Sequence, residues 1–330
     1  MTSAASPLAA RRPPLAVRLR SRVLAIRPKD TKFATLGFPP GAPGPTAALE
    51  GHAASFAFGY NAALAAVDVA DLAEPLGGTA PAERGFAYEG SGMALALLDL
   101  MTPGSSDRLG ALLRGHGEPY VHTINAGAGW ALARLRLRPR NRLPALDPFL
   151  RWLALDGYGF HEGLFRAPRF VSERATPRRL SGYERRAFDQ GLGRSLWFVD
   201  CADPERIART IGGFPTERRA DLWSGIGVAA TYSVAVEAGE LERLWELAGD
   251  FRPDVRLGSA LGAVIRHRAG NVVPHTHTAT ELFCGQTVDE VAEAAEQERA
   301  GLVADRTGES YELWRTRVRD RLGAGVPTSP

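Results

Sequence analysis

The amino-acid sequence predicts a mostly α-helical fold of stacked helix pairs, similar to an α-solenoid. Glycine-containing segments recur along the chain, segments with helix-capping residues lie between them, and a two-residue hairpin signal is absent. Repeats of this kind stack side by side because one helix–turn–helix unit cannot bury its apolar face alone. We therefore expect one continuous helical domain over residues 31–322, with two similar halves at about residues 45–156 and 183–295.

The repeat is clearest in two segments of the chain. FAYEGSGMALALLD (86–99) and AFDQGLGRSLWFVD (187–200) align without a gap as an acid or amide, a G-x-G motif, a leucine and a closing aspartate. With the weaker copies, the first glycines lie at positions 51, 90, 127, 163, 191, 225 and 258, separated by 39, 37, 36, 28, 34 and 33 residues. Five of these six intervals, 33–39 residues, match helix–turn–helix repeats.

Helix-terminal signals lie between the glycine segments. Asp147 and Asp203 are suited to be N-cap residues, and each precedes a proline suited to the first helical position. Thr287 and Glu290 have the spacing of a capping box. The segments SSDRLGALLRG and GELERLWELAG end in glycine, as helices often do. We expect these segments to form the second helices of the repeats.

The glycine segments themselves are interpreted as helices that approach one another closely. An interior glycine costs a helix about 1 kcal/mol relative to alanine, so two in one helix need a compensating gain. A residue without a side chain lets neighbouring backbones pack tightly, which supplies such a gain. A buried strand with bulges is the alternative, and strand-like runs such as SLWFVD (195–200) favour it.

The shortest interval lies at the centre of the chain. After Phe165 the sequence RAPRFVSERATPRRLSGY contains two prolines, is rich in arginine and lacks helical periodicity. We expect an irregular connection in place of the second helix here, so that the regular repeat breaks at its centre.

Composition excludes several classes of protein. Hydrophobic residues make up 45% of the chain and charged residues 23%, which is typical of a globular protein. The net charge of +3 comes from basic residues interleaved with acidic ones, so we expect no nucleic-acid partner. The two cysteines do not form a disulfide framework, and we expect a reducing compartment, the cytoplasm.

The chain ends are expected to be poorly ordered. Residues 1–30 are basic and lack the apolar core of a signal peptide, and residues 323–330 form a short tail. No run of about 18 apolar residues predicts a membrane span. Peripheral contact of the basic N-terminal segment with an anionic membrane or with a partner protein is the alternative to a frayed tail.

Candidate functional residues follow from stacking the repeats. The residues before the first glycines form one column: Glu50, Glu89, Ala126, Glu162, Gln190, Ser224 and Leu257. The preceding positions add Tyr88, Asn125, His161, Asp189 and Trp223. We hypothesise a catalytic centre of His161, Glu162, Asp189 and Gln190, because a histidine near carboxylates can act as a general acid or base. Candidate substrate-binding residues are Glu89, Asn125, Trp130, Arg194, Trp197, Asp221 and Trp223.

Structural roles are the alternative for the same residues. Polar side chains beside packing glycines can bond backbone groups or pair with arginines, and the tryptophans can belong to the core. His275 and His277 would share a face of a strand and form a weak metal-site candidate, for which no third ligand is evident. The sequence shows no recognised phosphate-binding, nucleophile-elbow, metalloprotease or dinucleotide motif, so the cofactor is unknown.

Several strings together resemble the bacterial DUF1702 family: RGFAYEGSGMALALLD, GAGWALARL, LDPFLRWLALDGYGFHEG, FDQGLGRSLWFV and DLWSGIG. The similarity runs from about residue 20 to YELWRTRVRDRL near the end. Members of this family resemble proteins encoded beside enediyne polyketide synthases, in the cassette that converts a linear polyene into the enediyne core. The resemblance implies natural-product biosynthesis, with an apolar polyene or partner enzymes of the same cassette as partners.

Two classes of function follow from the resemblance and the columns. In the first, the protein is a tailoring enzyme that holds a polyene in a helical groove for an oxidative or cyclising step. In the second, it is a non-catalytic scaffold or carrier that presents the intermediate to partner enzymes, since helical repeats often present concave surfaces. The missing cofactor motif favours the scaffold, and the polar residues at the break favour the enzyme.

Overall fold

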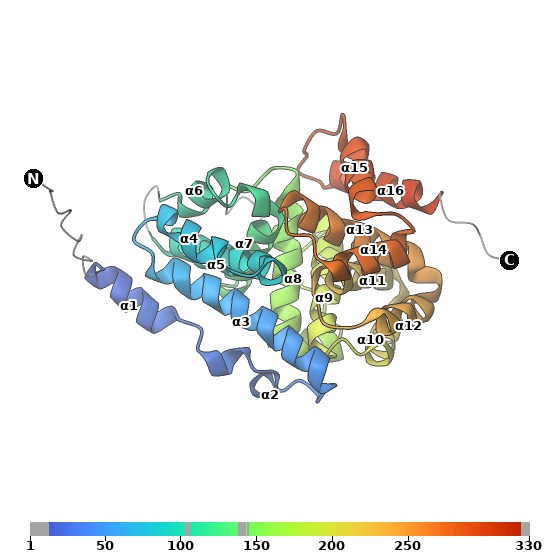
Figure 1. Ribbon diagram of the computed structural model, residues 1–330, viewed down its shortest axis with the longest axis horizontal. Coiled ribbons are helices and arrows are strands. Elements are labelled where there is room, and N and C mark those ends of the chain that lie inside the picture. Colours follow the sequence, from blue (N-terminus) through green and yellow to red (C-terminus); the bar gives the residue numbers. More distant parts are fainter. Residues whose placement is uncertain (1–12, 103–105, 138–142, 144, 325–330) are drawn as a thin grey trace, which may run out of the picture.

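The computed structural model of the chain describes residues 13–102, 106–137, 143 and 145–324. These residues form α-helices joined by turns and no β-strand, so the prediction of a mostly helical fold is confirmed (Figure 1). The core helices are α3 (Pro43–Ala65), α5 (Pro81–Met101), α7 (Val121–Arg134), α8 (Leu153–Phe165), α9 (Tyr183–Val199), α11 (Thr216–Tyr232) and α13 (Arg252–Arg268). The other helices are α1 (Leu15–Leu24), α2 (Phe33–Leu36), α4 (Ala73–Gly77), α6 (Arg108–Arg114), α10 (Pro204–Gly212), α12 (Ala238–Ala248), α14 (Pro274–Cys284), α15 (Val288–Arg299) and α16 (Glu309–Gly323).

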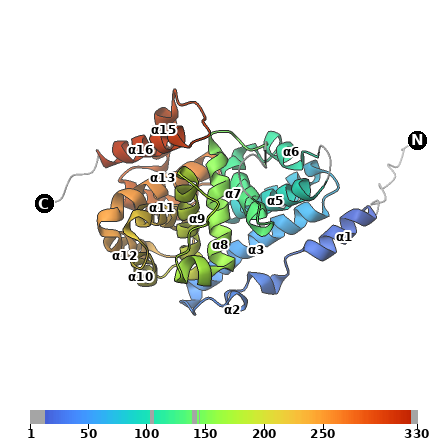
Figure 2. The same cartoon turned by 180° about the vertical axis from the view of Figure 1, so that it is seen from behind.

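The core helices stand in one row, in which each helix packs extensively on the next along the chain. Figures 1 and 2 show α8 and α9 between the two ends of this row. The row also coils, so that α5 meets helices far along the chain. Arg266 on α13 donates hydrogen bonds to the carbonyl oxygens of Pro81 and Ala82 at the start of α5, at 3.0 and 2.9 Å. The inside of this coil is where polar side chains from different repeats can meet.

The G-x-G motifs explain how the core helices pack in a row. Residues two apart on an α-helix lie about 200° apart, so the two glycines of one motif face opposite sides. A Cβ atom at Gly191 would fall on the carbonyl group of Asp156 in α8, and one at Gly193 on the carbonyl group of Leu222 in α11. The first glycine therefore lets the backbone of the preceding core helix pack closely, and the second does the same for the following core helix. The predicted close approach of backbones is confirmed.

The register of the glycine series predicted from the sequence is wrong at two positions. Gly51 has open space where a Cβ would lie, and a Cβ at Gly163 would meet the Ser195 side chain instead of a backbone. Gly59 is the packing glycine of α3, and Gly157 is the first of the G-x-G pair in α8. The corrected first glycines lie at 90, 127, 157, 191, 225 and 258, and their intervals are 37, 30, 34, 34 and 33 residues. The 28-residue interval therefore disappears.

Most of the predicted helix-terminal signals occupy the expected places. Asp203 caps α10 by accepting a hydrogen bond from the Arg206 backbone N–H at 3.0 Å, and Thr287 begins α15 with a capping box. Asp147 also accepts hydrogen bonds from backbone N–H groups, those of Phe149 and Leu150. A 3₁₀ turn, Leu150–Trp152, follows and continues directly into α8. The expectation of a separate second helix after Asp147 is therefore wrong.

The connection between α8 and α9 is irregular, as predicted. A single π-helical turn, Pro168–Ser172, follows α8, and the chain then reaches α9 without another helix. The strand interpretation of residues 195–200 is wrong, because residues 195–199 continue α9 to its end and residue 200 lies in the turn that follows. Packing on two neighbouring helices decides this, since the local sequence suits either structure.

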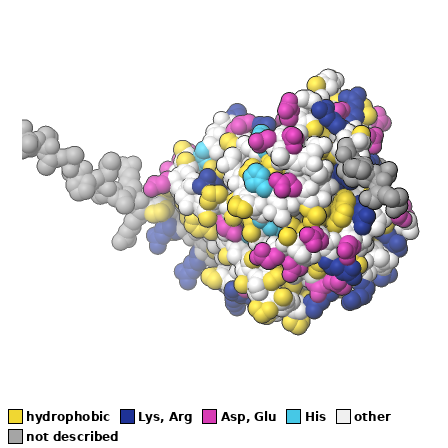
Figure 3. Space-filling view, turned by 45° about the vertical axis from the view of Figure 1, so that its right-hand side comes forward, with side chains coloured by type: hydrophobic (Ala, Val, Ile, Leu, Met, Phe, Trp, Pro, Cys, Tyr) yellow, Lys and Arg dark blue, Asp and Glu magenta, His cyan; other side chains and the backbone are white. Residues whose placement is uncertain are grey.

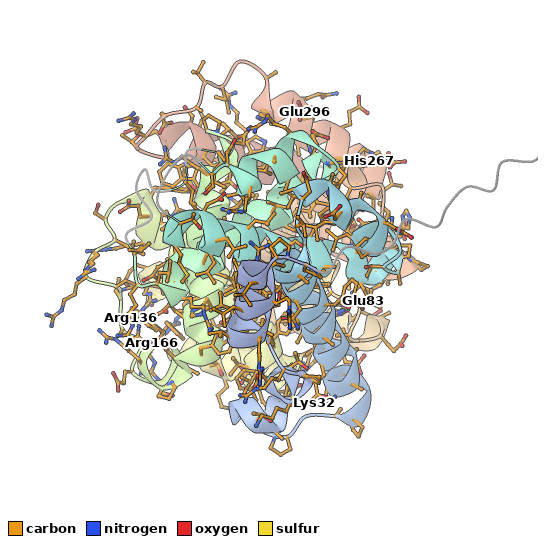
Figure 4. The ribbon with its side chains drawn as sticks, turned by 90° about the vertical axis from the view of Figure 1, so that its left-hand side faces the viewer. Lys32, Glu83, Arg136, Arg166, His267 and Glu296 are labelled. Atoms are coloured by element: carbon orange, nitrogen blue, oxygen red, sulfur yellow. The ribbon has the colours of Figure 1, made fainter. Side chains whose placement is uncertain are left out.

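Residues 25–42 run across the molecule from α1 to α3 and are called the strap here. The strap includes α2 and is tied to α3, because Lys32 pairs with Glu50 at 2.7 Å and the Phe33 backbone N–H donates to the same carboxylate at 2.9 Å (Figure 4 labels Lys32). Its far end is held by Arg206, which donates to the Pro40 carbonyl oxygen at 2.9 Å. The strap therefore forms one wall over the core helices.

The surface of the described chain mixes charges of both signs. On the face in Figure 3, acidic and basic side chains are interspersed. Among the described helices none is long and apolar enough to cross a membrane. Of the ends predicted to be poorly ordered, residues 1–30 and 323–330, residues 1–12 and 325–330 lie outside the described residues. Residues 15–24 of the basic segment form α1.

Candidate functional site

A buried polar network lies inside the coil of core helices. The Asp156 carboxylate on α8 accepts a hydrogen bond from Gln190 Nε2 at 2.9 Å and pairs with the Arg194 guanidinium group. The Gln190 amide oxygen accepts a hydrogen bond from Ser224 Oγ at 3.4 Å. Asp156, Gln190 and Ser224 each directly precede the first packing glycine of their helix. The repeat therefore brings equivalent positions of α8, α9 and α11 together.

A cavity called the aromatic pocket here lies between the strap and the core helices. It encloses about 630 Å³ of empty space, including its opening to solvent. Its aromatic walls come from the strap and from α3, α5, α7, α8 and α9: Phe33, Phe56, Phe86, Trp130, Phe160 and Phe198. The lining is therefore mostly apolar, as in many small-molecule pockets.

The aromatic walls form a continuous series of ring contacts. The ring centroids of Phe56 and Trp130 lie 4.5 Å apart, those of Trp130 and Phe160 lie 5.1 Å apart, and those of Phe160 and Phe198 lie 5.2 Å apart. Phe198 also contacts Phe33 of the strap at 6.5 Å. The chain therefore supplies flat apolar surfaces from four core helices and the strap to one cavity.

Glu89 on α5 is a carboxyl group in the wall of this apolar cavity. Its side chain is 3% exposed, and burial raises its pKa to about 7 even though the Arg194 charge opposes the shift. The Glu89 Oε1 atom lies 3.7 Å from Arg194 Nη2, beyond hydrogen-bond distance, and bonds no other described group. Glu89 therefore exchanges protons near neutral pH in a largely dry environment.

His52 on α3 is another polar residue in the wall of the aromatic pocket, which also includes Asp30 and Thr31 of the strap. Its ring stacks on Phe86 with 4.5 Å between centroids, and its Nδ1 atom lies 2.8 Å from Oε1 of Glu83, which Figure 4 labels on α5. Burial raises the pKa of Glu83, but the hydrogen bond to His52 and the His52 charge, together with Ser55 and Arg266, outweigh burial and leave that pKa below its ordinary value.

The ionised Glu83 carboxylate can only accept a hydrogen bond, so it orients the His52 ring with Nδ1–H toward it. The His52 Nε2 atom is buried and has no hydrogen-bond partner within the described part of the chain. In the neutral imidazole this nitrogen carries a lone pair. Carboxylate-oriented histidines of this kind act as general bases in many enzymes.

A second cavity adjoins the aromatic pocket. It encloses about 530 Å³ of empty space, again including its opening, and its lining includes Asp156, Arg194 and Tyr232. Because Arg194 lines this cavity and faces Glu89, which lines the aromatic pocket, these two side chains form the shared wall. The Tyr232 hydroxyl group fits into the space left by Gly85 on α5, and burial raises its pKa to about 12.

The family model for DUF1702, described as a protein of unknown function, matches residues 15–322. The chain belongs to the DUF1702 family. The matched region extends from the first residue of α1 to the last turn of α16, so both cavities lie within it. Comparison of this DUF1702 chain with curated proteins and with solved structures finds no match.

The four candidate catalytic residues of the DUF1702 protein lie in three separate bonded groups. Glu162 pairs with Arg166 at 2.7 Å (labelled in Figure 4), and Nδ1 of His161 lies 3.4 Å from Glu162 Oε1. Asp189 accepts hydrogen bonds from Nε and Nη2 of the buried Arg218 on α11, at 2.9 and 2.6 Å. Gln190 belongs to the Asp156 network. The His161 ring packs on Trp130, behind the wall of the aromatic pocket.

The candidate substrate-binding residues fall into two groups, those that line a cavity and those with structural partners. Glu89 and Trp130 line the aromatic pocket, and Arg194 lines the second cavity. The others have structural partners: Asn125 donates to the Leu150 carbonyl oxygen, Asp221 pairs with Arg186 and Arg315, and Trp197 and Trp223 are buried in the hydrophobic core.

The weak metal candidates lie on helix α14 and not on a strand. Residues two apart on a helix point in different directions. His275 Nε2 donates a hydrogen bond to the Ala230 carbonyl oxygen at 2.7 Å, and burial lowers the pKa of His275, whereas His277 is exposed. No group of three or more His, Cys, Asp or Glu side chains that could hold a metal ion occurs among the described residues.

The sequence interpretation missed His52, Glu83 and Asp156 as candidate residues of this DUF1702 protein. The sequence alignment took Gly163 instead of Gly157 as the first packing glycine of α8, so Glu162 was placed in the polar column in the position that belongs to Asp156. Glu83 and Glu89 lie six residues apart on α5, about 120° apart around the helix, so their spacing does not indicate a shared environment. The pairing of Glu83 with His52 joins residues 31 positions apart, and the local sequence carries no signal for it.

Proposed function

We propose that this DUF1702 protein is a tailoring enzyme that binds an apolar, conjugated polyene in the aromatic pocket and transfers protons on it. The observation that carries this proposal is the presence of Glu89 and of His52, whose ring pairs with Glu83, in the wall of one mostly apolar cavity. An acid with a pKa near neutrality and an oriented base are the two groups that proton transfer requires.

The walls of the pocket support an apolar conjugated ligand. Flat aromatic rings complement the flat faces of a polyene, and burial of apolar surface drives binding at about 25 cal/mol per Å². The same rings can stabilise positive charge that develops on the ligand, since the face of an aromatic ring attracts cations. A strongly polar ligand would leave its own polar groups unpaired against these walls.

Proton transfer between Glu89, the ligand and His52 is balanced without an oxidant. The protonated Glu89 carboxyl group donates its proton to one carbon of the polyene, and His52 Nε2 removes a proton from another carbon. The ligand keeps its formula, while its double bonds move or a ring closes. The imidazolium ion and the Glu89 carboxylate then return to their starting states by proton exchange with solvent. A cyclising or isomerising step on a polyene agrees with the enediyne association that the family resemblance implies.

Ligand binding is tested with diphenylhexatriene, an apolar polyene whose fluorescence rises in a dry environment. The proposal predicts saturable binding to the wild-type protein and competition by other apolar polyenes. Trp130→Ala removes a central wall and is expected to weaken binding at least about tenfold, given the usual loss when a buried aromatic side chain is truncated. Absence of saturable binding to the folded wild-type protein would remove the basis of the proposal.

Catalysis is tested with variants that keep the pocket but remove its chemistry. His52→Phe preserves the ring on Phe86, and Glu89→Gln preserves the volume of the side chain. Both are expected to bind diphenylhexatriene and to abolish metabolite production in a producing host. His161→Phe is the matched control, since this buried histidine also lies beside Trp130 and is expected to retain production. If only the His161→Phe variant lost production, the catalytic group would be His161 and not His52 or Glu89.

The alternative function is a non-catalytic carrier, and the apolar lining of the pocket supports it as well. A carrier needs the walls but not the acid and base. Full production by both His52→Phe and Glu89→Gln, together with loss of production in Trp130→Ala, would establish the carrier in place of the enzyme.

A further inference from the structure

Helix α1 presents apolar side chains to solvent. Leu15, Leu19 and Val23 are 75, 61 and 69% exposed. Their spacing of four residues places them along one side of the helix. Both Figure 1 and Figure 2 show α1 at the outer edge of the molecule, with its other side toward α3. Large exposed apolar stripes commonly mark interaction sites.

The orientation of α1 is fixed by its contacts with α3. Arg20 donates to the Leu64 carbonyl oxygen at 2.8 Å and to the Ala66 carbonyl oxygen, and Ser21 donates to the Leu64 carbonyl oxygen at 2.9 Å. Val17 on the same side of the helix is buried. The polar anchors and the buried valine therefore hold the stripe outward.

Positive charge accompanies the exposed stripe. Arg18 and Arg22 are exposed and lie on one flank of it, at positions three residues after Leu15 and Leu19. The sequence contains no acidic residue before Asp30. The outward side of α1 therefore combines an apolar strip with cations, which is the pattern of helices that lie in the headgroup region of anionic membranes.

We infer that the outward side of α1, formed by Leu15, Arg18, Leu19, Arg22 and Val23, docks on the surface of an anionic lipid bilayer. The apolar side chains enter the boundary between headgroups and acyl chains, while the arginines contact lipid phosphates. The strap begins directly after α1 and forms part of the wall of the aromatic pocket. The docked helix would therefore connect directly to a wall of this apolar cavity.

The inference is tested by flotation of the full-length protein with two kinds of vesicle. One kind contains phosphatidylcholine mixed with phosphatidylglycerol, and the other contains phosphatidylcholine alone. The wild-type protein is expected to bind the anionic vesicles and to dissociate as salt is raised. Arg18→Glu with Arg22→Glu is expected to weaken this binding at least about tenfold, because each basic residue near such a surface contributes about 1 kcal/mol.

The apolar contribution is tested separately, with a control matched for exposure. The triple variant Leu15→Ser, Leu19→Ser and Val23→Ser is expected to lose vesicle binding, whereas Val303→Ser, which removes a side chain 78% exposed outside α1, is expected to keep it. Circular dichroism and melting temperature verify that each variant is folded.

Three results would overturn the inference. The first is equal binding of the wild-type protein to both kinds of vesicle or to neither, and the second is unchanged binding of the triple variant. The third is a concentration-dependent dimer that the triple variant dissolves, because this would assign the stripe to a second copy of the chain. None of these results depends on the proposed chemistry of Glu89 and His52.

Discussion

Substitution of Gly191 by alanine tests the packing on which the whole row depends. A Cβ atom at this position would lie 1.7 Å from the carbonyl oxygen of Asp156, whereas ordinary contacts begin at 3.4 Å. Helices α8 and α9 would have to separate by about 1.7 Å at their contact to admit it. The obstructing atom belongs to a helical backbone and cannot rotate away, so a single methyl group is sufficient to disrupt the contact.

The expected loss of stability follows from two opposing effects. Overpacking of a well-packed core costs about 1–3 kcal/mol, and rigid backbone contact places Gly191→Ala near the upper end. Replacing an interior helical glycine by alanine returns about 1 kcal/mol of helix propensity. We expect a net loss of about 2 kcal/mol in the free energy of unfolding, and a larger loss for Gly191→Val because its side chain is branched.

Gly51→Ala provides the matched control. Gly51 is also interior to a helix, α3, but a Cβ atom there would meet nothing within 4 Å. At this site the gain in helix propensity is not opposed by overpacking, so Gly51→Ala is expected to stabilise the protein by up to about 1 kcal/mol. The assay is urea unfolding followed by circular dichroism, with the m-value checked for two-state behaviour. Equal or greater stability of Gly191→Ala relative to the wild type would refute close backbone packing as the reason for the glycine.

Two further predictions concern buried polar groups. The folded-state pKa of Glu89 is raised to about 7 from 4.5, so its stabilising contribution is complete below about pH 4.5 and is lost as the pH rises through 7. The free energy of unfolding of the wild type should therefore fall over this range by an amount on the order of 3 kcal/mol that Glu89→Gln lacks, and parallel pH profiles of the two proteins would contradict this. Gly85→Ala should be strongly destabilising because a Cβ atom there would overlap the Tyr232 hydroxyl group, and adding Tyr232→Phe should restore part of the loss. A double-mutant cycle measures that coupling, and strictly additive effects would argue against the overlap.

The sequence determined the local structure because helices and their ends depend on residues within a few positions of one another. The caps at Asp203 and Thr287 follow from side-chain oxygens that reach backbone N–H groups one turn away. The recurring G-x-G motif likewise indicated close helix packing, since few other arrangements compensate for two glycines inside one helix.

Register was harder to read in α8, because several glycines occur close together. GYG at 157–159 and the glycine of HEG at 163 are separated by less than two turns, and composition favours neither. Only the packed structure shows which of them meets a neighbouring backbone. That choice moved the polar column from Glu162 to Asp156, and with it the centre of the buried network.

The tertiary structure alone decided which polar groups share a cavity. Coiling of the row places Glu89 on α5 beside Arg194 on α9, 105 positions along the chain, and the strap forms another wall of the aromatic pocket. The raised pKa of Glu89 arises from burial that no local pattern encodes. Helix formation is governed by neighbours in sequence, but desolvation and charge pairing are governed by neighbours in space, so the candidate residues became apparent only in the folded chain.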